Sequence, residues 1–122
     1  MHTIRQILIG IVAAEHLGFL WVEMFAWETT GKTLFENSKL HELSFIASKG
    51  LAANQGLYNG FLAAGLIWTF FISDTVWKKN VSIFFLCCVA LAGIYGALST
   101  DPMIFFVQAL PAIIALLLVL FT

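Results

Sequence analysis

The stretch Ile4–Trp27 reads IRQILIGIVAAEHLGFLWVEMFAW, and it is apolar over almost its whole length. An apolar run of this length is typical of a helix that spans a membrane. Beyond Arg5 at its start, three ionisable side chains nevertheless lie inside it: Glu15 and His16 side by side, and Glu23 two turns further on. Such groups are costly in lipid and usually face a protein interior or a water-filled cavity. The stretch therefore predicts a polar site inside a membrane protein.

The composition of the chain also favours lipid as its solvent. Of 122 residues, 61% are hydrophobic and 11% are charged, whereas about a quarter of a soluble domain is charged. The net charge is -1 and no basic run is present, so nucleic acid is not expected as a partner. His2 and Arg5 precede the apolar run as in a signal peptide, but an uncleaved first span is favoured because no convincing cleavage site follows. We expect one domain, residues 1–122, in the cell membrane.

Four segments are predicted to cross the membrane as helices, which gives an all-α fold: a four-helix transmembrane bundle. Each comes close to the twenty residues that the hydrocarbon core requires. The four segments are Ile4–Trp27, Leu51–Ile72, Val81–Leu98 and Met103–Phe121.

The long connection between the first two spans is predicted to contain the start of the second helix. Asn37 or Ser38 is a candidate helix cap, and no proline follows until Pro102. The second helix is therefore expected to begin near Ser38 and to extend outside the membrane before it enters. This extension could be a lid over a pocket or a plain amphipathic connector at the membrane surface.

The positive charges do not determine the orientation of the chain. Three lie on the side of the termini (Arg5, Lys78 and Lys79) and three on the other (Lys32, Lys39 and Lys49). The compact Lys78-Lys79 pair, and the acidic residues on the other side, favour both termini in the cytoplasm.

Nearly all intramembrane polar groups are expected in the half of the membrane next to the long connection, here called the loop-side half. The spans alternate in direction, which brings together Glu23 of the first span, Asn54, Gln55, Tyr58 and Asn59 of the second, Tyr95 of the third, and Asp101 and Gln108 of the fourth. The opposite half is almost wholly apolar. Because buried polar groups need partners, these side chains should converge.

This pattern predicts a one-sided polar pocket that binds a small amphiphilic or lipid-like molecule. Candidate catalytic residues for acid-base chemistry, of an isomerase or hydrolase type, are Glu15, His16 and Glu23. Candidate ligand-binding residues are Asn54, Gln55, Tyr58, Asn59, Tyr95, Asp101 and Gln108. Whether the chain is an enzyme stays open. The alternatives are a small transporter, a structural or assembly subunit of a membrane complex, and a network that only locks the helices together.

Two contacts are predicted in particular. The Glu23 carboxyl group should hydrogen-bond directly to a side chain of the second span, with Asn54 or Tyr58 the expected partner. Glu15 lies about 100° around the helix from His16 and could reach the fourth span near Gln108.

No metal or cofactor is expected. The chain lacks paired histidine motifs, and the adjacent Cys87 and Cys88 lack the spacing of a redox or zinc motif. Membrane lipid is the expected surrounding partner. The small-residue stripe Gly56, Gly60 and Ala64 predicts close helix packing within the chain, or alternatively the seam of a homodimer.

Three segments carry a resemblance to a known family. They are EHLGF at 15–19, EMFAW at 23–27 and LAANQGLYNGFLAAG at 51–65. Together they resemble the domain of unknown function 1304 family, which consists of small four-helix integral membrane proteins. The resemblance covers nearly the whole chain and implies a four-span membrane protein whose signature positions match the polar set above. It implies no activity, substrate or cofactor.

Overall fold

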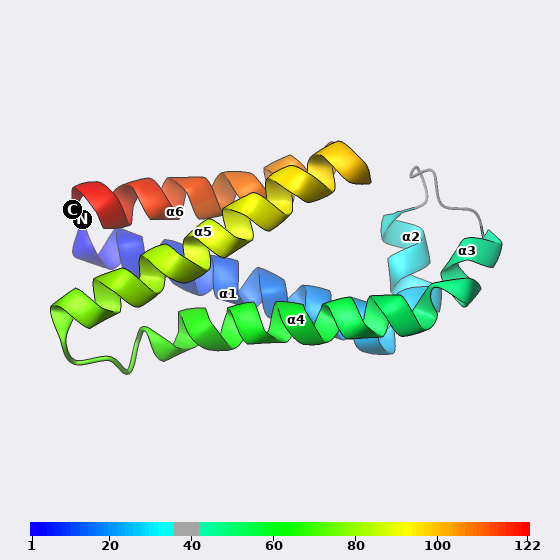
Figure 1. Cartoon of the computed structure of the whole chain (residues 1–122), viewed down its shortest axis with the longest axis horizontal. Coiled ribbons are helices and arrows are strands. Elements are labelled where there is room, and N and C mark those ends of the chain that lie inside the picture. The colour runs from blue at the N-terminus through cyan, green and yellow to red at the C-terminus, as the bar shows by residue number, and fades with distance from the viewer. Residues whose placement is uncertain (36–41) are drawn as a thin grey trace.

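The computed structural model describes residues 1–35 and 42–122, and within these it contains helices and no strand. Four long helical segments run side by side, and short helices gather at one end (Figure 1). The elements are α1 (His2–Phe25), η1 (Trp27–Gly31), α2 (Lys32–Leu34), α3 (Glu42–Ala47), α4 (Lys49–Trp68), α5 (Thr75–Ser99), η2 (Phe105–Ala109) and α6 (Leu110–Phe121).

The all-α prediction is confirmed, and the four predicted spans correspond to α1, α4, α5 and η2 with α6. Their ends differ by a few residues from those predicted. The helix α4 ends at Trp68, and the Thr69 hydroxyl donates to the carbonyl of Leu66 at 2.6 Å. The helix α5 begins earlier than predicted because Asp74 is its N-cap, with Oδ1 accepting from the backbone N–H of Trp77 at 2.8 Å.

The second helix is preceded by helical structure outside the bundle, as predicted in part. Only Ser48 separates α3 from α4. The predicted caps Asn37 and Ser38, and the start of the extension there, lie outside the described residues.

The fourth segment contains a π-helical turn, η2, directly before α6. Pro111 lies in the first turn of α6 and has no backbone N–H to donate to the carbonyl of Val107. A wider turn at this point accommodates the proline ring. Within η2 lies Gln108, so the irregular turn sets the direction of the one polar side chain of this segment.

The long segments form a ring in which α1 packs against α4 and α6, and α5 packs against α4 and α6. Small residues allow the close approaches. A Cβ atom added at Gly93 of α5 would lie 2.6 Å from the backbone nitrogen of Ala109, so α5 and η2 touch through their backbones. The apolar core lies in the half near the two termini and consists of Ile9, Val12, Ala13, Leu66, Leu86, Val89, Ala90, Ala112, Ala115 and Val119.

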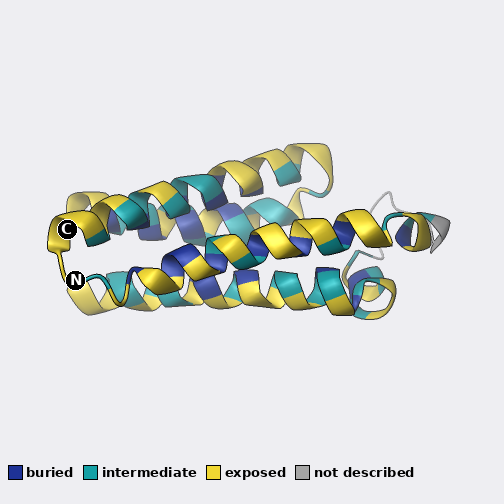
Figure 2. Ribbon diagram, turned by 60° about the horizontal axis from the view of Figure 1, so that its bottom comes forward, coloured by how far each residue is buried: buried dark blue, intermediate teal, exposed yellow. Residues whose placement is uncertain are grey.

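The outer surface of the bundle is rich in large apolar side chains. Figure 2 shows exposed residues along the outward sides of all four long segments. They include Ile11 and Trp21 on α1, Phe61 on α4, Leu91 on α5 and Leu117 on α6. Among the described residues, α1 and α5 are long and apolar enough to cross a membrane by length and composition. Taken alone, two such helices give weak support to a membrane location.

Candidate functional site

Glu23 joins α1 to α4 through both of its carboxyl oxygens. The side chain is 9% exposed. The Gln55 amide donates to Oε1 at 3.1 Å, and the Asn59 amide donates to Oε2 at 2.7 Å. Gln55 and Asn59 are four residues apart and therefore lie one above the other on the same side of α4. This pair of amides supplies each oxygen of the Glu23 carboxyl group with a hydrogen-bond donor.

The predicted hydrogen bond from Glu23 to the second span is confirmed, but the predicted partners, Asn54 and Tyr58, are wrong. The reason is the rotation of α4 about its axis. Gly56 faces Glu23 directly, since a Cβ atom added there would lie 2.9 Å from the Glu23 Cβ. Asn54 and Tyr58 are each two residues from Gly56, about 200° around the helix, and so point to the outer surface. Gln55 and Asn59 flank the contact instead.

His16 is fully buried and uses both of its ring nitrogens. Nδ1 lies 2.8 Å from the carbonyl oxygen of Val12, and Nε2 lies 3.2 Å from the side-chain nitrogen of Gln108. A carbonyl oxygen only accepts, so the proton is on Nδ1 and Nε2 accepts from the Gln108 amide. His16 therefore joins α1 to η2, much as Glu23 joins α1 to α4. The Phe19 ring packs edge-on against the imidazole, with ring centroids 5.2 Å apart.

Glu15 differs from its two neighbours on α1. The structure shows no hydrogen bond between Glu15 and Gln108, whose amide nitrogen lies beside Nε2 of His16. The Glu15 side chain is half-buried, and its Oε2 atom is enclosed without a hydrogen-bond partner. Among the described residues, no other buried side-chain nitrogen or oxygen lacks a partner.

The remaining predicted ligand-binding residues do not converge on this cluster. Tyr58 is 58% exposed and Tyr95 is 73% exposed. Asn54 is also exposed. Asp101 acts as a cap, with Oδ1 accepting from the backbone N–H of Met103 at 2.9 Å. The prediction of a single cluster of all polar groups is therefore too broad: the structure brings together Glu23, Gln55 and Asn59 in one set, and His16 with Gln108 in another.

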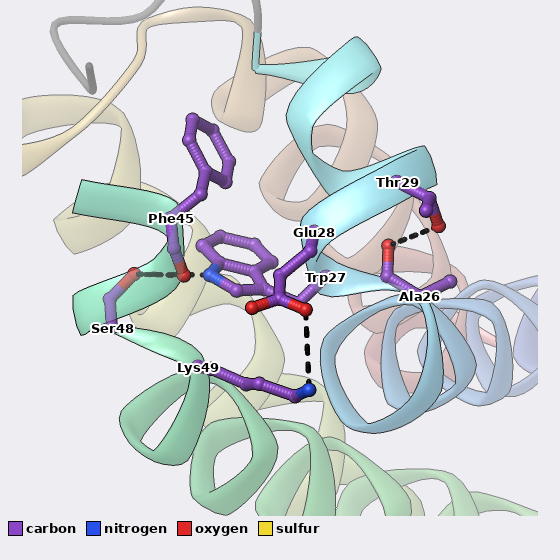
Figure 3. Close-up of polar contacts among 7 residues, drawn as sticks. All are labelled: Ala26, Trp27, Glu28, Thr29, Phe45, Ser48 and Lys49. Carbon is purple, nitrogen blue, oxygen red and sulfur yellow. Dashed lines mark hydrogen bonds and ion pairs between the residues drawn. The ribbon is translucent and has the colours of Figure 1, made fainter. Parts of the chain in front are cut away.

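A small aromatic cap closes the bundle one turn beyond Glu23 (Figure 3). The Trp27 indole packs against Phe35 and Phe45, with ring centroids 5.7 and 5.1 Å away, and its Nε1–H donates to the Ser48 hydroxyl at 3.0 Å. Sequence reasoning did not assign Trp27 this role. The signal was present in the aromatic side chains that follow Trp27 within the long connection.

An ion pair also spans the cap. The Lys49 ammonium lies 3.2 Å from Oε2 of Glu28, with 63% and 40% of the two side chains exposed (Figure 3). The cap thus ties the end of α1 to the start of α4 directly above the amide-bound Glu23.

The small-residue stripe of α4 is used within the chain. Gly56 faces Glu23 and Met24, and Gly60 faces Leu20, where an added Cβ atom would lie 2.5 Å from Cδ1. This is the intrachain packing expected from the stripe. The alternative homodimer seam through Gly56, Gly60 and Ala64 stays a prediction.

The described residues hold no group of three or more metal-ligating side chains of the His, Cys, Asp and Glu types. A hollow of about 450 Å³ is present at the end of the bundle away from the polar cluster. Its lining residues are Trp68, Ile72, Ser73, Asp74, Trp77 and Val81. The one-sided pocket expected in the loop-side half stays a prediction.

Comparison with known proteins identifies the family. The model of the family described as "Protein of unknown function (DUF1304)" matches residues 10–120. The uncharacterized protein YpaA of Lactococcus lactis subsp. lactis (strain IL1403) is 30% identical over 116 residues, which cover 94% of this chain and 96% of that protein. No solved structure matches the chain. The chain belongs to the DUF1304 family, as its sequence motifs predicted.

Proposed function

We propose that this chain, a member of the DUF1304 family, is a multi-pass membrane protein that binds a small amphiphilic or lipid-like molecule through its loop-side half. The observation that carries the proposal is the placement of two polar contacts, Glu23 with the α4 amides and His16 with Gln108, within an apolar framework. The half near the termini holds the apolar core instead. A polar region on one side only suits a ligand with a polar group and an apolar tail.

Four membrane crossings are the first part of this proposal. Large apolar side chains are exposed on each long segment, and a soluble protein rarely exposes so much contiguous apolar surface. Apart from Glu15 and Glu23, charged side chains lie toward the two ends: Arg5 and the Lys78-Lys79 pair at one, Glu28 and Lys49 at the other. Exposed Trp68 and Trp77 lie near the first end, where interfacial aromatics are expected. We propose a cell-membrane location with both termini in the cytoplasm.

The hydrogen bonds of His16 and Glu23 favour a binding function over acid-base catalysis. A general base needs a free lone pair directed at the substrate. The Nε2 lone pair of His16 faces the Gln108 amide, and each oxygen of Glu23 accepts from one amide. Catalysis by His16 would require breaking the contact that joins α1 to η2, and a reaction at Glu23 would compete with the two amides that join α1 to α4. An isomerase or hydrolase activity is therefore a second candidate, which depends on Glu15.

The proposal is tested by native mass spectrometry of the protein extracted from its membrane. A retained small molecule of lipid-like mass, at one per chain, is the expected result. A stoichiometric protein partner instead would favour the structural or assembly subunit. Solute or proton flux in reconstituted vesicles would favour the transporter, which the apolar half near the termini argues against. A chain that retains nothing and transports nothing would leave the polar contacts with a purely structural role and refute the proposal.

A further inference from the structure

The three ionisable side chains of α1 differ in how their polar atoms are used. Glu23 accepts one hydrogen bond at each oxygen, and His16 is engaged at each nitrogen. Glu15 has an enclosed oxygen that contacts no donor. A buried polar atom without a partner is unfavourable and rare in folded proteins, so its presence requires an explanation.

Glu15 lies where a molecule from outside the bundle could reach it. On α1, Met24 and Leu20 face α4, and His16 faces Gln108 of η2. From Met24 to Leu20 to His16, each step of four residues turns by about 40° in the same direction around the axis of α1. Glu15 lies about 100° further in that direction, so it points further from α4 than His16 does. Val12, one turn earlier, is fully buried, whereas Ile11 beside it is 45% exposed. The Glu15 carboxyl group therefore lies at the boundary between the bundle interior and its outer surface, near the middle of α1.

We propose that Glu15 is the residue that holds the ligand, and that the ligand carries a hydrogen-bond donor, a hydroxyl or an amine, on an apolar tail. The inference rests on the proposed binding function and names its contact residue and ligand class. A rotation of the half-buried Glu15 side chain toward the outer surface would bring the enclosed oxygen to a donor of the ligand, and the tail would lie along the apolar outer surface beside Ile11. Glu23 and His16 hold α1 in place for this contact and do not touch the ligand.

The first test separates a binding residue from a structural one by stability. In Glu15→Leu no hydrogen bond is lost and the unpartnered atom is removed, so the unfolding midpoint should stay the same or rise. In the matched variant Glu23→Leu two hydrogen bonds are lost and the midpoint should fall. A fall in Glu15→Leu as large as that in Glu23→Leu would mean that Glu15 holds the fold together, and it would overturn the inference.

The second test measures binding in lipid nanodiscs with three photoreactive probes that share one diazirine-bearing alkyl chain. One probe ends in a hydroxyl, one in a primary amine and one in a methyl group. We expect the hydroxyl or the amine probe to label α1 around Glu15, with an excess of the same unlabelled compound suppressing the labelling. Loss of one hydrogen bond to a carboxylate should reduce labelling about tenfold in Glu15→Leu.

The variant Glu15→Gln identifies the donor class. Its amide oxygen still accepts from a hydroxyl, so labelling by the alcohol should persist, whereas an ammonium loses its counter-charge and its labelling should fall. Equal labelling by the methyl-ended probe would show that an apolar surface alone binds the chain and would overturn the inference. Unchanged labelling in Glu15→Leu would overturn the inference but leave the proposed binding function intact. No labelling above the lipid background with any probe would overturn both.

Discussion

Replacing Glu23 and Asn59 singly and together measures the contact that holds α1 against α4. The two side chains are 9% and 8% exposed, and the amide nitrogen lies 2.7 Å from Oε2, within the range of a charge-assisted hydrogen bond. Hydrogen bonds to charged groups contribute about 1.5–3 kcal/mol in soluble proteins, but interhelical bonds within membranes average about 0.6 kcal/mol and reach about 1.7. Because both partners are buried, we expect a coupling energy near the upper membrane value, about 1–2 kcal/mol.

The assay is reversible unfolding in mixed micelles, followed by far-ultraviolet circular dichroism, for Glu23→Leu, Asn59→Leu and the double variant. The coupling energy is the difference between the double variant and the sum of the two single variants. Gln55→Leu is the matched control: its bond to Glu23 is longer, 3.1 Å, and Gln55 is exposed, so its coupling should be smaller. A Glu23–Asn59 coupling below about 0.3 kcal/mol would be indistinguishable from independent sites and would refute the reasoning.

Three further predictions concern the rest of the bundle. Gly93→Ala should destabilise the fold by about 1–3 kcal/mol, because the added Cβ would meet the backbone of η2. Gly18→Ala should stabilise α1 by about 0.5–1 kcal/mol, because no atom lies within 4 Å of the added Cβ. The unfolding midpoints of the two variants measure both effects. Gln108→Leu should lower the free energy of unfolding by about 1–3 kcal/mol, because it leaves Nε2 of His16 unpaired. Adding His16→Leu should recover part of this loss of stability. No recovery would contradict the assigned contact. Glu28→Gln should change stability by less than about 1 kcal/mol, because its ion pair is exposed; a larger loss in the same assay would show that the cap depends on it.

The long helices could be predicted from the sequence because a helix satisfies the backbone hydrogen bonds of a long apolar run within the run itself. The ends of the helices were harder to predict, because they depend on local contacts. The Asp74 cap, for example, makes α5 begin six residues before the predicted start at Val81. The short helices η1 and α2 carry no apolar period long enough to identify them.

The candidate site was predictable in its residue types and in its half of the bundle, but not in its pairings. Asn54, Gln55, Tyr58 and Asn59 fall within six residues of sequence, and only the rotation of α4 decides which of them meet Glu23. That rotation follows from the close approach of α4 to α1 at Gly56. No sequence pattern shows which helix Gly56 packs against. The pairing of His16 with Gln108 similarly depends on the π-helical turn before Pro111.

If the chain crosses the membrane as proposed, the amides of α4 have a consequence for its insertion. This helix is not among the described segments that are apolar enough to cross a membrane by composition, because Asn54, Gln55 and Asn59 interrupt its apolar sequence. A segment of this kind partitions poorly from the translocon into lipid by itself. Two of these three amides, Gln55 and Asn59, donate to Glu23, a residue synthesised earlier on α1. The first helix, α1, would then stay beside the lateral gate of the translocon until α4 emerges. It would act as an intramolecular chaperone for α4, and the two helices would enter the bilayer as a pair.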